Sequence, residues 1–327
     1  MRAAWYDRQG DAASVLEVGE LPDPSPGPGE VRVRISFSGV NPGDTKKRSG
    51  WQGGAMSFPR IVPHSDGAGV VEAVGDRVDR DRVGQRVWIY GAQSYRPFGT
   101  AAQFSCVPAA QAVPLPDEVS DGMGACLGIP GITAHRAVFS DGPVEGKTLL
   151  VHGVLGSVGS LAAQLASWGG ATVIGTVVRE SDLARVDGSV IAHAVALSDG
   201  DTSAAVRDFS PAGVDRIVEV ALSDNAELDA AVVANDAVIA AYATRRDRPE
   251  LPFWPLVFAN TTVRFLGSDD FPAAAKQQAA ADLTTAARSG ALTIAVGPPR
   301  ALAEIAGAHD DVDRGARDGR VVLAVGR

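Results

Sequence analysis

One long stretch without a charged side chain, "LLVHGVLGSVGSLAAQLASWGG" at residues 149–170, most constrains how this chain can fold. The uncharged run continues to Val178. A membrane-spanning helix needs about 20 apolar residues without strong breakers. Here six glycines interrupt the run, and His152, Ser157 and Gln164 add polar groups. We therefore interpret the stretch as a series of short buried elements, and we expect no association with a membrane.

The stretch divides into a strand, a turn, a helix and a second strand. "TLLVHG" is a short apolar run that ends in glycine, as expected for a strand buried on both faces of a parallel sheet. A helix follows, because apolar residues recur with a spacing of i, i+3, i+4 and i+7 at Val158, Leu161, Ala162 and Leu165. Gly169 and Gly170 end this helix, and "ATVIGTVV" predicts the second strand. Together these elements predict a βαβ unit.

The turn between the first strand and the helix carries three glycines, in the pattern Gly153-x-x-Gly156-x-x-Gly159. Glycines here let the backbone turn sharply, approach a pyrophosphate and pack the helix against the sheet. The helix N-terminus adds unpaired N–H groups and the positive end of its dipole. We therefore expect a dinucleotide site, with a merely tight turn as the alternative. The residues expected to contact the cofactor here are Gly153, Leu155, Gly156, Ser157 and Val158.

The end of the second strand bears on the choice between NADH and NADPH. An acidic residue there would bind the ribose 2′-OH, whereas a basic residue would bind the 2′-phosphate. The first charged residue after this strand is Arg179, and Thr176 and Ser181 offer hydroxyl groups. Glu180 follows Arg179 directly, so a solvated loop arginine is the alternative. We favour NADPH, with Thr176 and Arg179 as binding residues.

Composition excludes several classes of function. The 327 residues suffice for two domains, and a net charge of −9 disfavours binding to phosphate backbones, so we expect no nucleic-acid partner. Two cysteines, Cys106 and Cys126, cannot form a disulfide framework or a four-ligand zinc lobe. The opening "MRAAWYDRQG" lacks the apolar segment of a signal peptide. We therefore expect a cytoplasmic protein.

The pattern of the chain changes twice. Residues 1–118 contain short β-type runs between Pro and Gly breakers, which predicts a β-rich domain. Residues 119–270 alternate strands and helices, with buried strands predicted at "GVDRIVEVA", "DAVIAAYAT" and "TTVRFLGS". Residues 271–327 form a C-terminal segment that returns to β-type runs. We expect this segment to rejoin the first domain.

Within the C-terminal segment we expect one long helix and one short one. The long helix begins at Pro272 and ends before Gly290, because proline suits the first turn of a helix and glycine the residue after its end. The short helix lies near residues 300–308, between the β-type runs "LTIAV" and "GRVVLAV".

Five stretches, taken in order, resemble the medium-chain dehydrogenase/reductase superfamily. They are "SGVNPGDTKKRSG", "PHSDGAGVVEAVGDRV", "GIPGITAHRAVF", "LLVHGVLGSVGSLAAQLA" and "AVIAAYATRRDRPELPFWPLVFANTTVRFLGSDDF". More narrowly, the chain is similar to the zinc-free NADPH:quinone oxidoreductases, the zeta-crystallin-like branch. The resemblance implies an α/β protein with a GroES-like β-rich catalytic domain and a Rossmann domain with a doubly wound parallel sheet. It places the site in the cleft between them, at the carboxyl ends of the parallel strands.

The positions that hold zinc in other members of this superfamily carry other residues here. Asn41 and Ser65 stand where those members have Cys and His, and Ile129 is the nearest match to the third ligand. Because a catalytic zinc needs about three soft or imidazole ligands, we expect no metal. His64 lies one residue before the histidine position. We interpret it as a satisfied loop or cleft histidine, with a stray metal ligand as the alternative.

The resemblance also implies roles for polar residues near the nicotinamide. Asn41 would polarise the acceptor carbonyl, while Asp44 would orient the same loop or simply cap a turn. Thr133 would lie beside the nicotinamide ring, or serve only as a hydroxyl at a helix start. Lys46 and His64 are the candidate proton donors, with a solvated loop charge as the alternative for Lys46.

Two further strand ends complete the expected cofactor site. By resemblance, the nicotinamide half of the cofactor contacts Tyr242, Leu266, Gly267 and Ser268, with a core position as the alternative for Leu266. The run "PFWPLVF" at residues 252–258 lines either the acceptor site or a dimer surface. Edge strands of this domain make a homodimer the expected assembly.

Three hypotheses for function follow. The first is an NADPH-dependent, zinc-free oxidoreductase that reduces a quinone. The second keeps the fold and cofactor but reduces the C=C bond of an α,β-unsaturated carbonyl compound or thioester, which needs a proton donor. The third is a non-catalytic NADPH-binding protein. The partner expected under the first two is a small-molecule quinone or enone.

Overall fold

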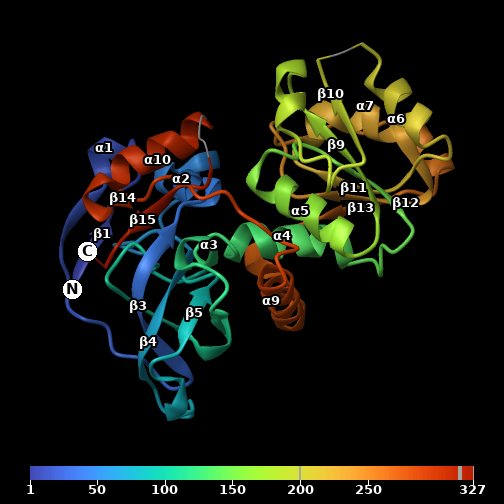
Figure 1. Cartoon of the computed structure of the whole chain (residues 1–327). Helices are drawn as coiled ribbons and strands as arrows, with labels where there is room; N and C mark the ends of the chain where they lie inside the picture. Colours follow the sequence, from blue (N-terminus) through green and yellow to red (C-terminus); the bar gives the residue numbers. More distant parts are fainter. Residues whose placement is uncertain (199, 316–318, 327) are drawn as a thin grey trace. The chain divides into compact units, whose positions relative to one another are not determined.

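The computed structural model describes residues 1–198, 200–315 and 319–326, and the chain folds into two compact units (Figure 1). Unit 1 consists of Met1–Pro130, Ala280–Arg288 and Thr293–Arg327. Unit 2 consists of Gly131–Ala279 and Ser289–Leu292. Each unit has its own sheet and its own hydrophobic core.

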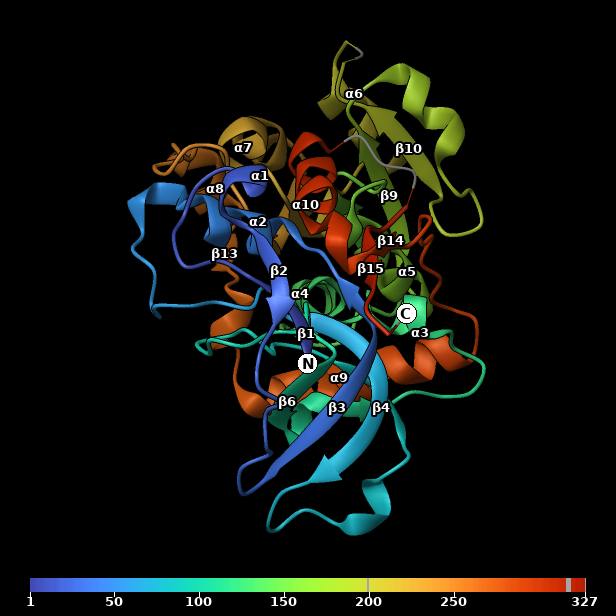
Figure 2. The ribbon, with the colours of Figure 1, turned by 90° about the vertical axis from the view of Figure 1, so that its left-hand side faces the viewer.

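Unit 1 is built on a mainly antiparallel sheet with the strand order β14-β15-β3-β4-β5-β7, in which β6 also pairs with β3. Strands β1 and β2 form a separate antiparallel pair. On β3, Val31, Val33 and Ile35 are buried at alternate positions, as the period of a strand requires. Figure 2 shows β3 and β4 curving side by side. The strands are β1 (Arg2–Trp5), β2 (Glu17–Glu20), β3 (Glu30–Gly39), β4 (Asp66–Val74), β5 (Arg86–Ile89), β6 (Phe104–Pro108), β7 (Ala112–Pro114), β14 (Arg300–Ala301) and β15 (Val322–Ala324).

The helices of unit 1 are short except at its C-terminal end. Helix α10 buries Ile305, Ala308 and Val312 in the core of the sheet, and their spacing places them on one helical face. Helix α2 follows β3 and begins at Pro42, which suits the first turn of a helix. The helical elements are α1 (Ala12–Val15), α2 (Pro42–Ser49), η1 (Trp51–Gly53), η2 (Arg80–Arg82), η3 (Ala109–Gln111), α3 (Asp121–Gly124), η6 (Leu302–Glu304) and α10 (Ile305–Arg314).

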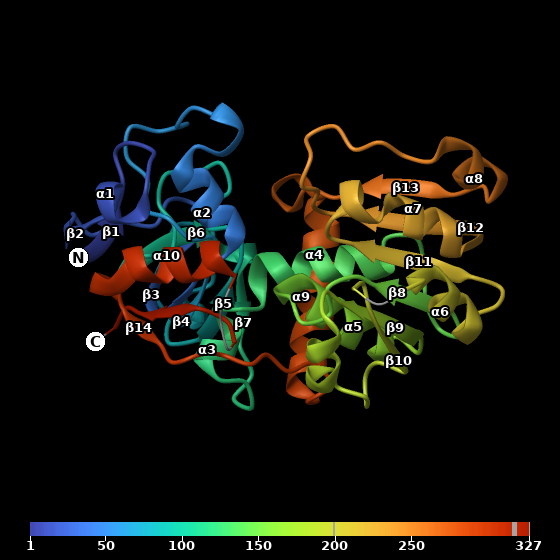
Figure 3. The ribbon, with the colours of Figure 1, turned by 90° about the horizontal axis from the view of Figure 1, so that it is seen from above.

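Unit 2 contains a six-stranded parallel sheet with the order β10-β9-β8-β11-β12-β13 (Figure 3). From β8 the chain moves to β9 on one side, and from β11 it moves to β12 on the other. Because such crossovers are right-handed, α5 and α7 cover opposite faces of the sheet. The strands are β8 (Thr148–Val151), β9 (Thr172–Val177), β10 (His193–Ala196), β11 (Val214–Glu219), β12 (Val233–Ala241) and β13 (Thr262–Phe265).

The central strands of unit 2 are covered on both faces, which explains their continuous apolar sequences. β8 is buried from Leu149 to Val151 and β9 from Val173 to Val177. The helical elements of this unit are α5 (Ser157–Trp168), η4 (Glu180–Arg185), α6 (Thr202–Phe209), α7 (Leu222–Val232), α8 (Phe253–Phe258) and η5 (Ser268–Asp270). Two longer helices, α4 (Gly128–Phe139) and α9 (Ala273–Arg288), contribute residues to both units.

The predicted fold class is confirmed, and so are most predicted elements. The βαβ unit around the glycine-rich loop is β8, α5 and β9, and the long C-terminal helix is α9. The predicted strand "LTIAV" is wrong, because only Val296 of this run pairs, in a single bridge to Arg320. The short helix near 300–308 is instead α10, which extends to Arg314. None of the described helices combines the length and apolar character that crossing a membrane requires.

Candidate active site

The glycine-rich loop of unit 2 lies at the carboxyl edge of the parallel sheet, between β8 and α5. The neighbours of β8 are β9 and β11. The chain continues from β8 to β9 on one side and from β11 to β12 on the other side, so the direction of the strand order changes between β8 and β11. The loop therefore lies at the switch point of the strand order, where open α/β sheets bind their ligands.

Steric constraints explain the glycines of this loop. Gly153 has a φ of 65°, in the left-handed region that favours glycine. A Cβ atom on Gly159 would lie only 2.3 Å from the carbonyl oxygen of Gly153, so glycine allows the helix to start close to the strand. Gly156 is the N-cap of α5 and cannot cap the helix with a side chain, which suits phosphate binding at this N-terminus.

The five residues predicted to contact a cofactor in this loop all have surface that a ligand can reach. Leu155 and Gly156 are exposed, and Gly153, Ser157 and Val158 are partly exposed. Gly159 is buried, in agreement with a packing role. The loop thus offers backbone and small side chains, a donor set that fits a pyrophosphate group.

Thr176, also predicted to bind the cofactor, is fully buried at the end of β9. Its hydroxyl oxygen accepts a hydrogen bond from the backbone N–H of Gly153 at 3.2 Å. The same oxygen lies 3.0 Å from Nδ1 of His152. The Thr176 hydroxyl therefore faces the interior and holds the start of the loop.

Arg179 follows β9 and precedes η4, and its side chain is 70% exposed. Its Nε donates to Oδ2 of Asp182 at 3.0 Å, and this hydrogen bond raises the pKa of Arg179. Arg185 donates to the same carboxylate at 3.3 Å. The guanidinium of Arg179 is thus held near the end of β9 by a carboxylate, and its exposed side can receive an anion.

The predicted residues at the ends of β12 and β13 take different surroundings. Tyr242 is half-buried directly after β12, and desolvation raises the pKa of its phenol. Leu266 follows β13 and donates its backbone N–H to Ala241 at 2.9 Å. Leu266 and Ser268 are half-buried and Gly267 is exposed. All four lie at the carboxyl edge of the sheet, as does the glycine-rich loop.

In unit 1, the side chain of Asn41 is held from two sides at the start of α2. Its Nδ2 donates to Oδ2 of Asp66 at 2.7 Å, and its Oδ1 accepts from Arg320 at 2.5 Å. Its backbone N–H donates to Asp44 at 2.8 Å, which orients the first turn of α2. The side chain of Asn41 is buried, and these contacts fix the orientation of its amide.

Asp66 is fully buried at the start of β4 and accepts hydrogen bonds from several directions. Both carboxylate oxygens lie 2.9 Å from the backbone nitrogen of Ile129. Burial, and then the charge of Asp44, raise the pKa of Asp66 to about 7. Gly128 leaves room for this carboxylate, because a Cβ there would lie 2.1 Å from Oδ1.

His64 is buried in unit 1, with both ring nitrogens engaged by other side chains. Its Nδ1 lies 2.7 Å from Oγ of Ser38, and its Nε2 lies 2.9 Å from Nε2 of His309. Burial, and then the neighbouring imidazole, hold the pKa of His64 well below its ordinary value. The neutral ring has no nitrogen left to offer a substrate or a metal.

The other three predicted catalytic residues differ in exposure. Lys46 is exposed, and its ammonium lies over the ring of Trp51 at 4.6 Å from the ring centroid. Asp44 is buried and receives the backbone N–H of Asn41. Thr133 is buried within α4.

Several residues of these two regions have no counterpart among the predicted ones. Asp66 directly follows Ser65, which stands where zinc-binding members of the superfamily have histidine, so its place in "PHSDGAG" was the available signal. Arg320 reaches Asn41 across 279 residues of sequence, and no local pattern points to it. Glu219 and Asp229, which lie beside His152, come from separate elements of unit 2 and were also missed.

Comparisons with known proteins show similarity to dehydrogenases and quinone oxidoreductases. Residues 27–117 match the family model of the alcohol dehydrogenase GroES-like domain. A quinone oxidoreductase from Mus musculus is 29% identical over 296 residues, which cover 89% of this chain and 87% of the mouse protein.

Solved structures agree over nearly the whole chain. A mycobacterial quinone oxidoreductase superimposes with a TM-score of 0.87 at 27% identity and covers 99% of both chains. A mycobacterial protein in complex with NADPH superimposes with a TM-score of 0.84 at 28% identity, again over 99% of both chains.

Proposed function

Because the chain belongs to the medium-chain dehydrogenase/reductase superfamily, and its relatives are quinone oxidoreductases, we propose that it reduces a quinone with NADPH. More broadly, the chain is an oxidoreductase that uses NADPH. When bound, NADPH supplies a hydride from its nicotinamide ring. The residues of the chain must bind this cofactor, orient it and stabilise charge on the acceptor.

The donor set of unit 2 fits the cofactor. The backbone of the glycine-rich loop and the N-terminus of α5 would hold the pyrophosphate, with Gly153, Leu155, Gly156, Ser157 and Val158 as contacts. Arg179 would bind the 2′-phosphate, because its guanidinium is exposed and already held at the end of β9. Thr176 would support the loop from inside, since its hydroxyl is committed to Gly153 and His152.

The nicotinamide half would meet the ends of β12 and β13. Tyr242, with Leu266, Gly267 and Ser268, supplies backbone groups there, and these four residues remain our proposed contacts. Thr133 remains a proposed contact from α4.

The observation that carries the proposed acceptor chemistry is the fixed amide of Asn41. Its orientation is set by Asp66 on one side and Arg320 on the other, so its second amide hydrogen is preorganised. A preorganised donor stabilises the negative charge that builds on a carbonyl oxygen during reduction. We assign Asn41 to this role, with Asp44 orienting the same turn.

The residues at the positions that hold zinc in other members of the superfamily support a metal-independent reaction. Asn41 offers an amide that is already bound on both sides, and Ile129 contributes only a backbone N–H, to Asp66. Neither residue is a zinc ligand of the thiolate or imidazole type. Electron-poor quinones accept a hydride without the Lewis acid that alcohol oxidation requires.

Reduction of a C=C bond is the second candidate, and it differs by its need for a proton donor. Lys46 is exposed over Trp51, and both nitrogens of His64 are occupied. Neither residue is arranged as an internal acid, which favours quinones, whose products take protons from water. Identification of the product distinguishes the candidates: a hydroquinone supports the proposal, and an enone reduced at its C=C bond contradicts it.

NADPH binding with no turnover on any acceptor would support a non-catalytic protein.

Asn41→Ala tests the role of Asn41. We expect turnover of a quinone at saturating NADPH to fall by about a hundredfold, because that is the usual effect of removing one such donor. Unchanged turnover would rule out this role.

We also propose a homodimer, formed along β13. This strand lies at one edge of the six-stranded sheet, and Phe265 on it is 69% exposed. Nearby in sequence, helix α8 exposes Phe253, Trp254 and Phe258. An exposed aromatic group beside a sheet edge is typical of an interface. Light scattering on the purified protein tests the dimer, and a monomeric mass would contradict it.

Two free cysteines fit the proposed cytoplasmic location.

A further inference from the structure

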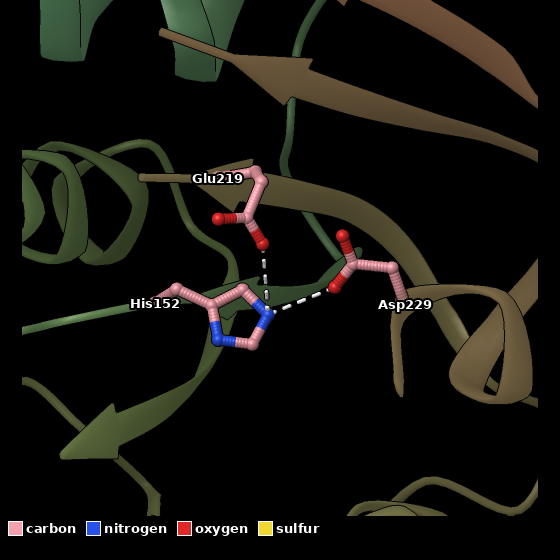
Figure 4. A group of neighbouring side chains, drawn as sticks. All are labelled: His152, Glu219 and Asp229. Atoms are coloured by element: carbon pink, nitrogen blue, oxygen red, sulfur yellow. Dashed lines mark hydrogen bonds and ion pairs between the residues drawn. The ribbon is translucent and has the colours of Figure 1, made fainter. Parts of the chain in front are cut away.

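A buried histidine and two buried carboxylates lie close together in unit 2 (Figure 4), and the histidine directly precedes Gly153, the first residue of the glycine-rich loop. His152 follows β8, Glu219 ends β11, and Asp229 lies on α7. The Nε2 atom of His152 is 2.9 Å from Oδ1 of Asp229 and 3.5 Å from Oε2 of Glu219. All three side chains are 0–1% exposed, so water does not screen these charges. We call these three residues the His152 cluster.

Hydrogen bonds connect this cluster to the first residue of the loop. The backbone N–H of Gly153 can only donate, so the Thr176 oxygen accepts from it at 3.2 Å. The hydroxyl hydrogen of Thr176 can then be donated to Nδ1 of His152, 3.0 Å away. This leaves Nε2 of His152 to carry the hydrogen that Asp229 accepts. A neutral His152 with its proton on Nε2 therefore satisfies both of its ring nitrogens and the Thr176 hydroxyl, whereas Oδ2 of Asp229 has no hydrogen-bond partner among the described residues.

The cluster also holds an ionisable proton. Burial opposes a charge on His152, but the hydrogen bond to Asp229 and the charges of Asp229 and Glu219 outweigh it and raise the pKa of His152. Burial, and then the charge of Asp229, raise the pKa of Glu219 to about 7. Tyr242 is the further titratable group that faces Glu219. One proton shared by His152 and Glu219 thus keeps the cluster at a single negative charge, and its loss makes the charge −2.

We propose that His152 is a positioning residue for the cofactor. Through Thr176 it fixes the start of the pyrophosphate-binding loop. The shared proton of the His152 cluster then sets the affinity of this loop for an anion. This inference rests on the proposed function, because it assigns the loop to the pyrophosphate of NADPH. A second buried negative charge beneath the loop repels the pyrophosphate. Affinity therefore falls as the pH rises and the shared proton leaves.

A metal ion is the competing explanation for such a cluster, because a histidine and two carboxylates are common ligands. The observed distances favour the proton. At 2.9 Å, Nε2 of His152 and Oδ1 of Asp229 form an ordinary hydrogen bond, and Asn225 donates to both oxygens of Glu219 at 3.0–3.1 Å. A metal would have to displace these hydrogen bonds of His152 and Glu219, and Oδ2 of Asp229 is the one oxygen of the cluster without a hydrogen-bond partner among the described residues.

The first test concerns the cofactor-free protein and needs no turnover. Thr176→Val removes the hydroxyl at nearly constant shape, whereas Thr176→Ser keeps it. Hydrogen–deuterium exchange of the peptide covering the loop should be faster in Thr176→Val and unchanged in Thr176→Ser. The dissociation constant for NADPH, measured by fluorescence titration, should rise about tenfold in Thr176→Val alone. Equal exchange and equal binding in both variants would overturn the anchoring role.

The second test addresses the shared proton. ADP-ribose is the probe, because it carries the pyrophosphate without the titrating 2′-phosphate. In the wild type its dissociation constant should rise severalfold between about pH 6 and pH 9. Glu219→Gln should abolish this rise, since Gln keeps the cluster at one negative charge and Asn225 can turn its amide to match. Glu227→Gln, an exposed change on the same helix α7, should keep the wild-type profile.

The outcomes separate the two proposals. If NADPH and ADP-ribose do not bind the wild type, the proposed function fails, while loop exchange in the cofactor-free variants still tests the anchor. A pH profile that Glu219→Gln leaves intact would overturn the role of the proton. One equivalent of tightly bound metal in the purified wild type, lost in Glu219→Gln, would overturn it in favour of a metal site. If Thr176→Val does not fold, the pH profile of Glu219→Gln decides.

Discussion

The side-chain amide of Asn41 donates a hydrogen bond to the carboxylate of Asp66 at 2.7 Å, and this contact joins two segments that are separate in sequence. Asp66 in turn accepts the backbone N–H of Ile129. A buried carboxylate that binds an amide from one side and a peptide N–H from the other leaves the amide little freedom to rotate. The proposed oxyanion donor is therefore rigid before the acceptor arrives.

Replacing Asp66 should impair turnover without affecting the cofactor. In Asp66→Asn, one of the two groups that donate to Asp66 loses its acceptor, so Asn41 is no longer fixed. We expect kcat for a quinone to fall by about ten- to a hundredfold, with an unchanged dissociation constant for NADPH. Asp117→Asn is the matched control, because the side chain of Asp117 is 98% exposed. Equal losses in both variants would contradict the positioning role.

Cofactor preference should depend on Arg179. In Arg179→Gln, we expect KM for NADPH to rise about tenfold and KM for NADH to stay the same, because a charge-assisted hydrogen bond to phosphate is lost. Arg185→Gln is the control, since Arg185 binds the same Asp182 carboxylate. Steady-state kinetics with both nucleotides measure the effect. A parallel rise for NADH would mean that Arg179 acts on the loop and not on the phosphate.

A methyl group at Gly159 should disrupt the loop. The new Cβ would lie 2.3 Å from the carbonyl oxygen of Gly153, and this backbone atom cannot move without shifting the strand end. We expect Gly159→Ala to lower the free energy of unfolding by about 1–3 kcal/mol and to weaken NADPH binding strongly. Gly188→Ala, which has nothing within 4 Å of its Cβ, should behave as wild type. Denaturant unfolding that does not separate the two variants would refute the steric argument.

Two buried carboxyl groups, Asp66 and Glu219, should each make the folded protein less stable as the pH rises from about 4 to about 7. Burial raises the pKa of Asp66 to about 7, so the folded protein keeps a proton that the unfolded chain has already released. The associated stability is fully present below the ordinary carboxyl pKa and is lost as the pH passes through about 7. Glu219, with a pKa of about 7 from burial and Asp229, acts in the same direction.

Denaturant unfolding at a series of pH values checks this dependence. Two buried histidines, His64 and His309, act in the opposite sense between about pH 4 and 6.5, because burial lowers their pKa values. Paired carboxylates such as Asp141, whose pKa is lowered by Arg264, do so below about pH 4. We therefore compare the wild type with Glu219→Gln. The difference between their free energies of unfolding should shift against the wild type by on the order of a few kcal/mol between about pH 4 and 7. A difference that shifts in favour of the wild type across this window would contradict the raised pKa of Glu219.

Local patterns in the sequence were sufficient to predict the parallel sheet and the glycine-rich loop. The apolar runs of β8 and β9 and the spacing from Gly153 to Gly159 lie within one continuous stretch, so their period shows directly. Strand β10 was missed because His193 and Ala194 make its apolar character weak. "LTIAV" has the composition of a strand, but its backbone finds only the single bridge at Val296.

The side-chain partners could not be predicted, because tertiary packing brings them together. Arg320 reaches Asn41 from the C-terminal segment, and Asp229 reaches His152 across 77 residues. The burial of Thr176 could not be predicted from the sequence either. Its position at the end of β9 was predicted, but the inward direction of its hydroxyl was not.

The most direct test of the central claim is the oxidation of NADPH by the purified wild-type protein, followed by absorbance. Phenanthrenequinone, benzoquinone and cyclohexenone are offered in parallel, with NADH as the control nucleotide. The account predicts turnover of the quinones with NADPH, much weaker turnover with NADH, and none with cyclohexenone. Turnover of cyclohexenone alone, or of none of the three while NADPH still binds, would contradict it.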